Sequence, residues 1–165
     1  MQVLIMRHGQ AQNFVERGNH DDSQRALTEH GKQEASIMAS WLDKKHLKPS
    51  QVFVSPYIRA QETCDIMTAN MQSTITTLDI ITPEGNAKQV HDYIDGYLSE
   101  LVVDSNKQTP LLIVSHMPLV SYLVAQLTQS MHTPIFATGG IAHIDYNIRT
   151  MKGQLLAMVS PTQLQ

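Results

Sequence analysis

Three short segments of the chain carry the side chains whose types and spacing could do chemistry. They are Arg7-His8-Gly9, Ser55-Pro56-Tyr57-Ile58-Arg59 and Ser115-His116-Met117-Pro118, and each begins where a short apolar run ends. An arginine presents a planar fork of donors that matches phosphate oxygens, and it stays charged at any working pH. Two arginines and two histidines could therefore surround a phosphoryl group from several sides.

One of the two histidines could also act as a nucleophile. Neutral imidazole can attack phosphorus, and nearby guanidinium charges disfavour its protonated form, which keeps a lone pair available. The arginine pair would stabilise the charge on the group in transfer, and Gly9 would let the backbone approach that group closely. The N-terminal ends of helices expected near Pro56 and Pro118 could add positive potential.

The apolar pattern indicates which elements position these segments. Short apolar runs bounded by polar residues predict strands, and they cover residues 2–6, 51–54, 74–81 and 111–114, with a closing hairpin of 140–147 and 154–160. Amphipathic spacing, N-cap residues and proline at a helix start predict helices. These run from Thr28 to before Pro49, from 56 to 71, from 87 to 103, and onward from Pro118. Residues 9–27 are expected to form a loop.

Strands that alternate with long helices favour a three-layer α/β/α sandwich, in which a central, mainly parallel sheet has helices on both faces. Ligands of such sheets bind outside the carboxyl ends of the strands. This rule selects the places that follow Met6, Val54 and Val114, where the three segments begin.

Length, charge and cysteine content narrow the class of protein. The 165 residues suit a single domain over 1–165. A net charge of −3 argues against a nucleic-acid binder that relies on a basic surface. The single Cys64 excludes an internal disulfide and a cysteine-based zinc cluster. No apolar run is long enough for a signal peptide or a membrane span, so we expect a soluble cytoplasmic protein.

Together, the segments resemble the motifs of the histidine phosphatase superfamily, which includes cofactor-dependent phosphoglycerate mutases and acid phosphatases. Arg7-His8-Gly9 is similar to its opening motif, and residues 25–35 resemble its Leu-Thr-x-x-Gly-x-x-Gln-Ala helix start. Ser55-Pro56-x-x-Arg59-Ala60-x-x-Thr63 and Ser115-His116-x-Pro118 are similar to its second and last motifs. The resemblance covers most of the chain. The short length and the opening residues are most similar to the SixA-type phosphohistidine phosphatases of bacteria.

The resemblance implies a role for each matching residue. His8 would be the nucleophile and would carry a transient phosphoryl group, while Arg7, Arg59 and His116 would hold the phosphate oxygens. Arg25, beside the Leu-Thr motif, would reach the phosphate or the partner. The expected substrate contacts are completed by Gly9 and Ser55. No metal or organic cofactor is implied, and the remaining histidines show no metal-ligand spacing.

Larger members of the superfamily supply a carboxylic acid that protonates the leaving oxygen. The candidates here are Glu84, in Thr82-Pro83-Glu84-Gly85, and Asp21 or Asp22 in the loop after the first strand. A protonated imidazole leaves phosphorus easily, whereas an alkoxide needs an acid worth about 10²–10⁴ in rate. The lack of a clear acid therefore favours phosphohistidine over phosphate monoesters.

Large members also carry insertions that cover the pocket, and this chain is too short to contain them. We therefore expect an open pocket that admits a protein surface. The favoured hypothesis is a metal-independent phosphohistidine phosphatase of phosphorelay or two-component signalling. Its partner would be the phosphorylated phosphotransfer domain of a sensor kinase or a histidine-phosphorylated carrier protein. The alternatives are a small-molecule phosphomonoesterase or mutase of the same superfamily, a metal-dependent phosphoesterase using His8, His116 and an aspartate, and a non-catalytic phosphoprotein-binding adaptor.

Overall fold

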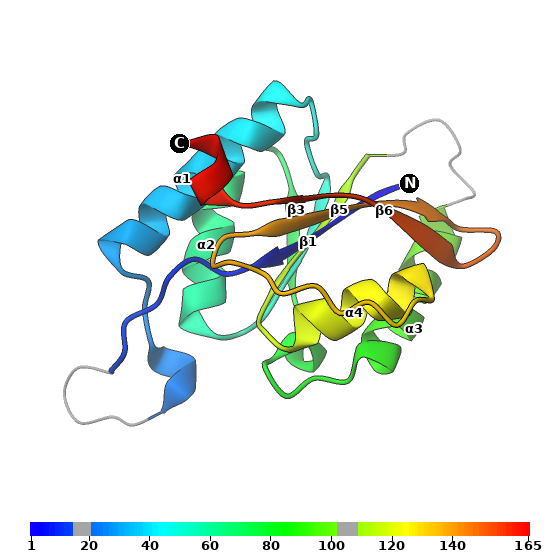
Figure 1. Cartoon of the computed structure of the whole chain (residues 1–165), viewed down its shortest axis with the longest axis horizontal. Helices are drawn as coiled ribbons and strands as arrows, with labels where there is room; N and C mark the ends of the chain where they lie inside the picture. Colours follow the sequence, from blue (N-terminus) through cyan, green and yellow to red (C-terminus); the bar gives the residue numbers. More distant parts are fainter. Residues whose placement is uncertain (15–20, 102–108) are drawn as a thin grey trace.

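A computed structural model of the chain describes residues 1–14, 21–101 and 109–165. Its strands form one six-stranded sheet in the order β3-β2-β4-β1-β5-β6 (Figure 1). The strands are β1 (Gln2–Arg7), β2 (Gln51–Val54), β3 (Thr74–Thr77), β4 (Leu111–Ser115), β5 (Ile141–Asn147) and β6 (Lys152–Val159). The first four are parallel to one another, and the hairpin β5–β6 adds two antiparallel strands beside β1. The predicted mainly parallel sheet is confirmed.

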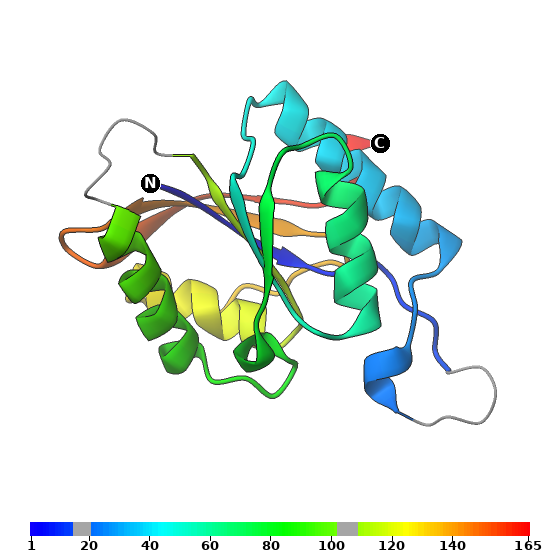
Figure 2. The same cartoon turned by 180° about the vertical axis from the view of Figure 1, so that it is seen from behind.

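Helices cover both faces of this sheet. One face carries α1 (Glu29–Lys44) and α2 (Ile58–Thr68), and the other carries α3 (Ala87–Leu101) and α4 (Leu119–Thr128) (Figures 1 and 2). Short 3-10 helices are η2 (Asp22–Gln24), η3 (Asp79–Ile81) and η5 (Pro161–Leu164), the last lying against α1. The predicted three-layer sandwich is thereby confirmed. Within the described ranges, no helix has the length and apolar character needed to cross a membrane.

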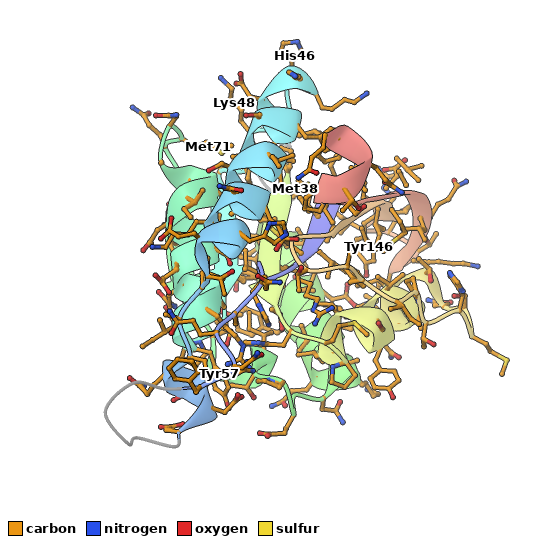
Figure 3. All side chains as sticks on the ribbon, turned by 60° about the vertical axis from the view of Figure 1, so that its left-hand side comes forward. Met38, His46, Lys48, Tyr57, Met71 and Tyr146 are labelled. Atoms are coloured by element: carbon orange, nitrogen blue, oxygen red, sulfur yellow. The ribbon has the colours of Figure 1, made fainter. Side chains whose placement is uncertain are left out.

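Strand β1 shows how the sequence builds two cores at once. Successive side chains of a strand point to opposite faces of the sheet. Val3 and Ile5 pack with α3 and α4, whereas Leu4 and Met6 pack with α1 and α2, where Met38 points from α1 toward the sheet (Figure 3). A slip of one residue would exchange these sets. Burial on both faces therefore fixes the register, which delivers the next residues of the chain to the carboxyl edge of the sheet.

The first turn of α1 packs directly on the chain that follows β1. Thr28 is the N-cap, as predicted, and its hydroxyl accepts a hydrogen bond from the Gly31 N–H at 3.0 Å. A Cβ atom on Gly31 would lie 2.1 Å from the Gln10 carbonyl oxygen, and one on Gly9 would lie 2.5 Å from the Gly31 carbonyl oxygen. Only glycines allow this approach of two backbones.

Two of the predicted boundaries are corrected by hydrogen bonding. The strand predicted over 74–81 ends at Thr77 and continues as η3, because its neighbour β2 ends at Val54, whose carbonyl accepts the Leu78 N–H as the last rung. The helix predicted from Pro56 begins at Ile58, since the Ser55 hydroxyl accepts the Tyr57 N–H.

The remaining boundaries are close to prediction, with exceptions in two loops. The helix predicted over 56–71 ends at Thr68, and the hairpin strands lie within two residues of their predicted bounds. Within the predicted loop of 9–27, residues 22–24 form η2, while 15–20 lie outside the described residues. The predicted helix end at Val103 also lies outside them.

A matched pair of glycine variants tests the packing at the start of α1. Gly31→Ala should lower the free energy of unfolding by about 1–3 kcal/mol, because the new methyl group must displace the Gln10 backbone. Gly96→Ala in α3 should raise it by about 0.5–1 kcal/mol, because nothing lies within 4 Å of the added Cβ and alanine favours helix. Urea unfolding of both variants measures the difference. Equal stability of the two would contradict the packing described.

Candidate active site

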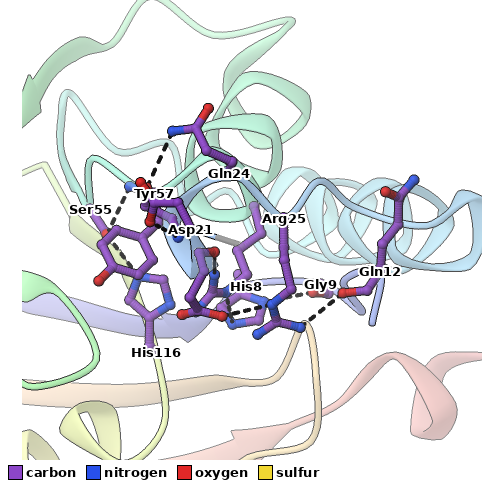
Figure 4. A network of polar contacts seen from close by, with 12 residues as sticks. His8, Gly9, Gln12, Asp21, Gln24, Arg25, Ser55, Tyr57 and His116 are labelled. Atoms are coloured by element: carbon purple, nitrogen blue, oxygen red, sulfur yellow. Dashed lines mark hydrogen bonds and ion pairs between the residues drawn. The ribbon is translucent and has the colours of Figure 1, made fainter. Parts of the chain in front are cut away.

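The three chemistry-bearing segments meet at one edge of the sheet, as predicted. They follow β1, β2 and β4, which are adjacent parallel strands and so end on the same side. The His8 N–H donates to the Ser115 carbonyl at 3.0 Å, and the Ser55 N–H donates to the Val114 carbonyl at 3.1 Å. Figure 4 shows His8, Ser55, Tyr57 and His116 gathered there with Asp21 and Arg25.

His8 is held in one tautomer by two neighbours. The residue is 7 % exposed, and Nδ1 lies 2.7 Å from the Gly9 carbonyl oxygen. Because a carbonyl can only accept, Nδ1 carries the proton. The other ring nitrogen, Nε2, then has the lone pair, and it accepts a hydrogen bond from Arg59 Nε at 3.2 Å. The lone pair of His8 is therefore directed to a guanidinium.

The surroundings of His8 also keep it neutral. Burial lowers the pKa of His8 to about 4, and the charges of Arg59, Arg7 and Arg25 act in the same direction against the opposing hydrogen bond to Gly9. At neutral pH the imidazole is therefore neutral, with a proton on Nδ1 only, and in this state it can act as a nucleophile.

Arg59 is the central cation of the cluster. It lies in the first turn of α2, is 3 % exposed, and has its guanidinium 5.0 Å from the centre of the Tyr57 ring. Its Nη atoms donate to the Asp22 carbonyl at 2.7 Å and to the Asp22 carboxylate at 2.9 Å. Thr63, one turn further on, accepts from the Gly9 N–H at 3.1 Å and donates to the Arg59 carbonyl at 2.7 Å. This hydroxyl ties α2 to the segment after β1.

His116 faces His8 from the end of β4. The ring centroids lie 5.0 Å apart, and the Tyr57 ring packs on His116 at the same separation. Its Nε2 is hydrogen-bonded to the Ser55 hydroxyl at 2.7 Å, while the buried Nδ1 has no partner among the described residues. Burial and then the neighbouring His8 lower the pKa of His116, so this ring is neutral as well. Ser55, fully buried, orients His116, and its predicted contact with substrate stays a prediction.

Arg7 carries the other buried nitrogen of the site that has no hydrogen-bond partner among the described residues. One Nη donates to the Phe136 carbonyl at 2.8 Å, but the buried Nε has no partner in the described part of the chain. Burial lowers the pKa of Arg7, Glu34 opposes this, and the guanidinium remains charged. A buried donor without a partner costs roughly 1–3 kcal/mol. An oxyanion bound beside His8 could accept from Arg7 Nε, and also from His116 Nδ1 when the Ser55 hydroxyl donates to His116 Nε2 and leaves the ring proton on Nδ1.

Of the three candidate acids, Asp22 makes the closest contacts. Partial desolvation raises the pKa of its carboxyl, but hydrogen bonds from Arg25 (2.7 Å) and Arg59 outweigh this effect, and the net pKa is lowered. Asp22 is thus ionised at neutral pH and has no proton to donate. Arg25 also donates to the Gln12 carbonyl at 2.9 Å, and its contact with phosphate or partner stays a prediction.

The other two candidate acids are exposed, as Asp22 is. Asp21 is exposed and caps η2 by accepting the Ser23 N–H at 3.0 Å. Glu84 is exposed in the turn after η3. Burial raises the pKa of Tyr57, and the charges of Glu84, Asp22 and Asp21 act in the same direction. Asp21 and Glu84 each stay a prediction for the acid of the reaction.

Sequence reasoning gave no role to Thr63, Tyr57 or the Phe136 carbonyl. Thr63 was detectable, because it follows Arg59 by four residues on one helix and so shares its face. The Phe136 carbonyl gave no signal, since every residue type has one. For residues 1–14, 21–101 and 109–165, no three His, Cys, Asp or Glu side chains are grouped as metal ligands. The charges that act on the pKa of His8 are those of Arg59, Arg7 and Arg25.

Comparisons with known proteins agree with this arrangement. The family model of the "Histidine phosphatase superfamily (branch 1)" matches residues 3–82. "Phosphohistidine phosphatase SixA" of Escherichia coli (strain K12) is 36 % identical over 146 residues, which cover 87 % of this chain and 84 % of that protein. The "Phosphohistidine phosphatase SixA homolog" of Haemophilus influenzae is 33 % identical over 154 residues, with 87 % of each covered. A structure of the protein histidine phosphatase SixA complexed with tungstate superposes over the full length of both chains, with a TM-score of 0.89 and 34 % identity.

The protonation state of His8 can be measured directly. We expect its ring to keep the Nδ1–H tautomer from pH 8 down to 5 and to protonate with a midpoint near pH 4. Arg59→Ala should raise this midpoint, because one of the charges that disfavour the imidazolium is gone. Two-dimensional ¹H–¹⁵N spectra of the imidazole nitrogens report both. A wild-type midpoint above pH 6 would contradict the site as described.

Asp22 competes with any anion for the guanidinium of Arg59. Asp22→Asn should bind inorganic phosphate or tungstate about fivefold more tightly, corresponding to roughly 1 kcal/mol for a partly exposed ion pair. Titration calorimetry at low salt measures the affinity. The control is Asp43→Asn, which changes an exposed aspartate of α1 that pairs with Lys48. It should leave the anion affinity unchanged. Weaker binding by Asp22→Asn would mean that the carboxylate is needed to hold Arg59.

Proposed function

The chain belongs to the histidine phosphatase superfamily, and from this premise we propose that it hydrolyses phosphohistidine on other proteins. The observation that carries the proposal is the neutral His8, with its Nε2 lone pair beside Arg59. The two relatives named as phosphohistidine phosphatase SixA and its homolog support the substrate class, since each matches most of this chain.

In the first step, His8 Nε2 attacks the phosphorus of the substrate. A bond forms between Nε2 and phosphorus while the bond from phosphorus to the partner's imidazole breaks. The electron pair of that bond goes to the partner's imidazole, which takes up a proton from solvent. Because Nδ1 keeps its proton, the imidazole ring of phospho-His8 is cationic, and the Gly9 carbonyl that accepts this N–H stabilises the charge of the ring.

In the second step, water attacks the phosphorus of phospho-His8. The P–N bond breaks, its electron pair returns to Nε2, and inorganic phosphate leaves with the oxygen and protons of the water. His8 is restored as the neutral Nδ1–H tautomer. The cationic ring of the intermediate is the better leaving group, so a proton kept on Nδ1 serves both steps.

The positive charges of the site would stabilise the phosphoryl group in transfer. Arg59 donates to Nε2 of His8 and is therefore next to the atom that bonds to phosphorus. Arg7 Nε supplies one donor, and His116 Nδ1 supplies another when the Ser55 hydroxyl donates to His116 Nε2 and the ring proton is on Nδ1; neither nitrogen has another partner among the described residues. Preorganised donors of this kind favour the transition state, because they need no reorganisation as charge develops. We propose that Arg7 and Arg59 supply the positive charge that a metal ion supplies elsewhere, so that turnover is metal-independent.

The state of the carboxyls supports an imidazole leaving group. Asp22 is ionised and held by two arginines, so it has no proton for a leaving alkoxide. An imidazole needs less assistance than an alkoxide, for which a general acid is worth about 10²–10⁴ in rate. The proposed partner is the phosphorylated phosphotransfer domain of a sensor kinase or a histidine-phosphorylated carrier, and residues 1–165 act as one domain.

Phosphate release from a histidine-phosphorylated phosphotransfer domain, assayed in EDTA, tests the proposal. Wild type should release phosphate, His8→Ala should show none, and Arg59→Ala should lose about 10²–10³-fold in kcat/KM, as expected when a charge on the transferring group is removed. His132→Ala, at an exposed histidine, is the matched control and should behave as wild type.

Three results would overturn the proposal. Activity of His8→Ala near that of wild type would remove the nucleophile. Faster turnover of small phosphate monoesters than of the phosphoprotein would favour a small-molecule phosphomonoesterase, and binding without release would favour an adaptor.

A further inference from the structure

Glu34 of α1 is the one buried acidic side chain among the described residues, with 4 % of its surface exposed. Taking a carboxylate out of water is costly unless its oxygens accept hydrogen bonds. Glu34 is not one of the three candidate acids. Its hydrogen bonds indicate a different role.

Each carboxylate oxygen of Glu34 holds a different loop. Oε1 accepts from the Gln10 N–H at 2.8 Å, and Oε2 accepts from the Thr138 hydroxyl at 2.8 Å. His30, on the preceding turn of α1 and exposed, lies 3.8 Å from Oε2. The Glu34 side chain thus joins two segments that lie 24 residues before it and 104 residues after it in the sequence.

Both segments directly support the proposed catalytic residues. Gln10 follows His8 and Gly9 without a break. In the second segment, the Gly139 N–H donates to the His8 carbonyl at 2.9 Å, and the Gly140 carbonyl accepts the Arg7 N–H at 3.0 Å. The Phe136 carbonyl of this segment also accepts from the Arg7 guanidinium. A shift of either segment would move Arg7 and His8.

The charge of Glu34 acts on Arg7 as well. Burial lowers the pKa of Arg7, and the Glu34 carboxylate is the contribution that raises it.

We propose that Glu34 is a positioning residue of this site: its two hydrogen bonds fix the main chain on both sides of Arg7 and His8 in the geometry that phosphoryl transfer needs. The inference rests on the proposed function. Misplacing reacting groups by about 1 Å can cost about 10²-fold in rate. The effect is therefore expected mainly in kcat.

Three variants separate the contributions of Glu34. Glu34→Ala removes both hydrogen bonds and should lower kcat by about 30- to 100-fold, with a smaller change in KM. Glu34→Gln keeps both, because its amide oxygen can accept from Gln10 and its amide NH₂ can donate to Thr138, so kcat should recover to within about fivefold of wild type. Thr138→Val breaks one bond and should lose about five- to tenfold. Glu29→Ala and Glu29→Gln, at an exposed position of the same helix, are the matched controls and should behave as wild type.

Phosphate release from the phosphorylated domain is measured well below the melting temperature of every variant, so that lost stability does not lower the rate. Tungstate affinity is measured in parallel, and Glu34→Ala should weaken it about tenfold. Wild-type kcat and tungstate affinity in Glu34→Ala would overturn the inference, and so would a Glu34→Gln variant as impaired as Glu34→Ala. If Glu34→Ala does not fold, Glu34→Gln and Thr138→Val decide by the same criteria. If the proposed function is wrong, the wild type itself will release no phosphate from the phosphorylated domain. The tungstate affinities of the variants would then be the test of the role of Glu34.

Discussion

The hydrogen bond from Arg59 Nε to Nε2 of His8 is the interaction on which the site depends. It exists only if His8 is neutral, because a protonated Nε2 would direct a hydrogen toward a guanidinium that is itself a donor. The requirement is met from the opposite side of the ring, where the Gly9 carbonyl accepts from Nδ1. Burial and neighbouring positive charge then hold the pKa of His8 low. One contact therefore fixes the tautomer, the direction of the lone pair and the charge of the ring.

Cations gathered in the interior require compensation, and the fold supplies it from several elements. Arg59 donates to Asp22 of η2, and Arg7 donates to the Phe136 carbonyl that precedes β5. Glu34 of α1 adds a negative charge behind Arg7. The compensation is incomplete, since Arg7 Nε and His116 Nδ1 remain unpaired in the described structure. The site is thus stable enough to form, while donors remain for an anion.

The fold was largely predictable because its strands are buried on both faces. Such strands appear as short apolar runs, and the polar residues that follow each run mark the carboxyl end of the strand, as after Met6, Val54 and Val114. Predictions were poorer where backbone bonding decides a boundary. The strand predicted to reach Ile81 stops at Thr77, because no partner strand continues beside it. The helix predicted from Pro56 begins two residues later, because a serine hydroxyl takes the Tyr57 N–H.

Residue type and strand-end position are local properties, and they were enough to predict the fold class, the edge of the sheet that carries the candidate site, and the candidate set Arg7, His8, Arg59 and His116. The other contacts of the site depend on the folded chain. It pairs Asp22 with two arginines, orients His116 through Ser55, and joins Gln10 to Thr138 through Glu34. Apart from the pair Asp22–Arg25, which is three residues apart, these contacts span 24 to 104 residues of sequence. Three of them use a main-chain N–H or a hydroxyl, groups that give no sequence pattern. Their energies depend on distance and burial, which are properties of the folded chain.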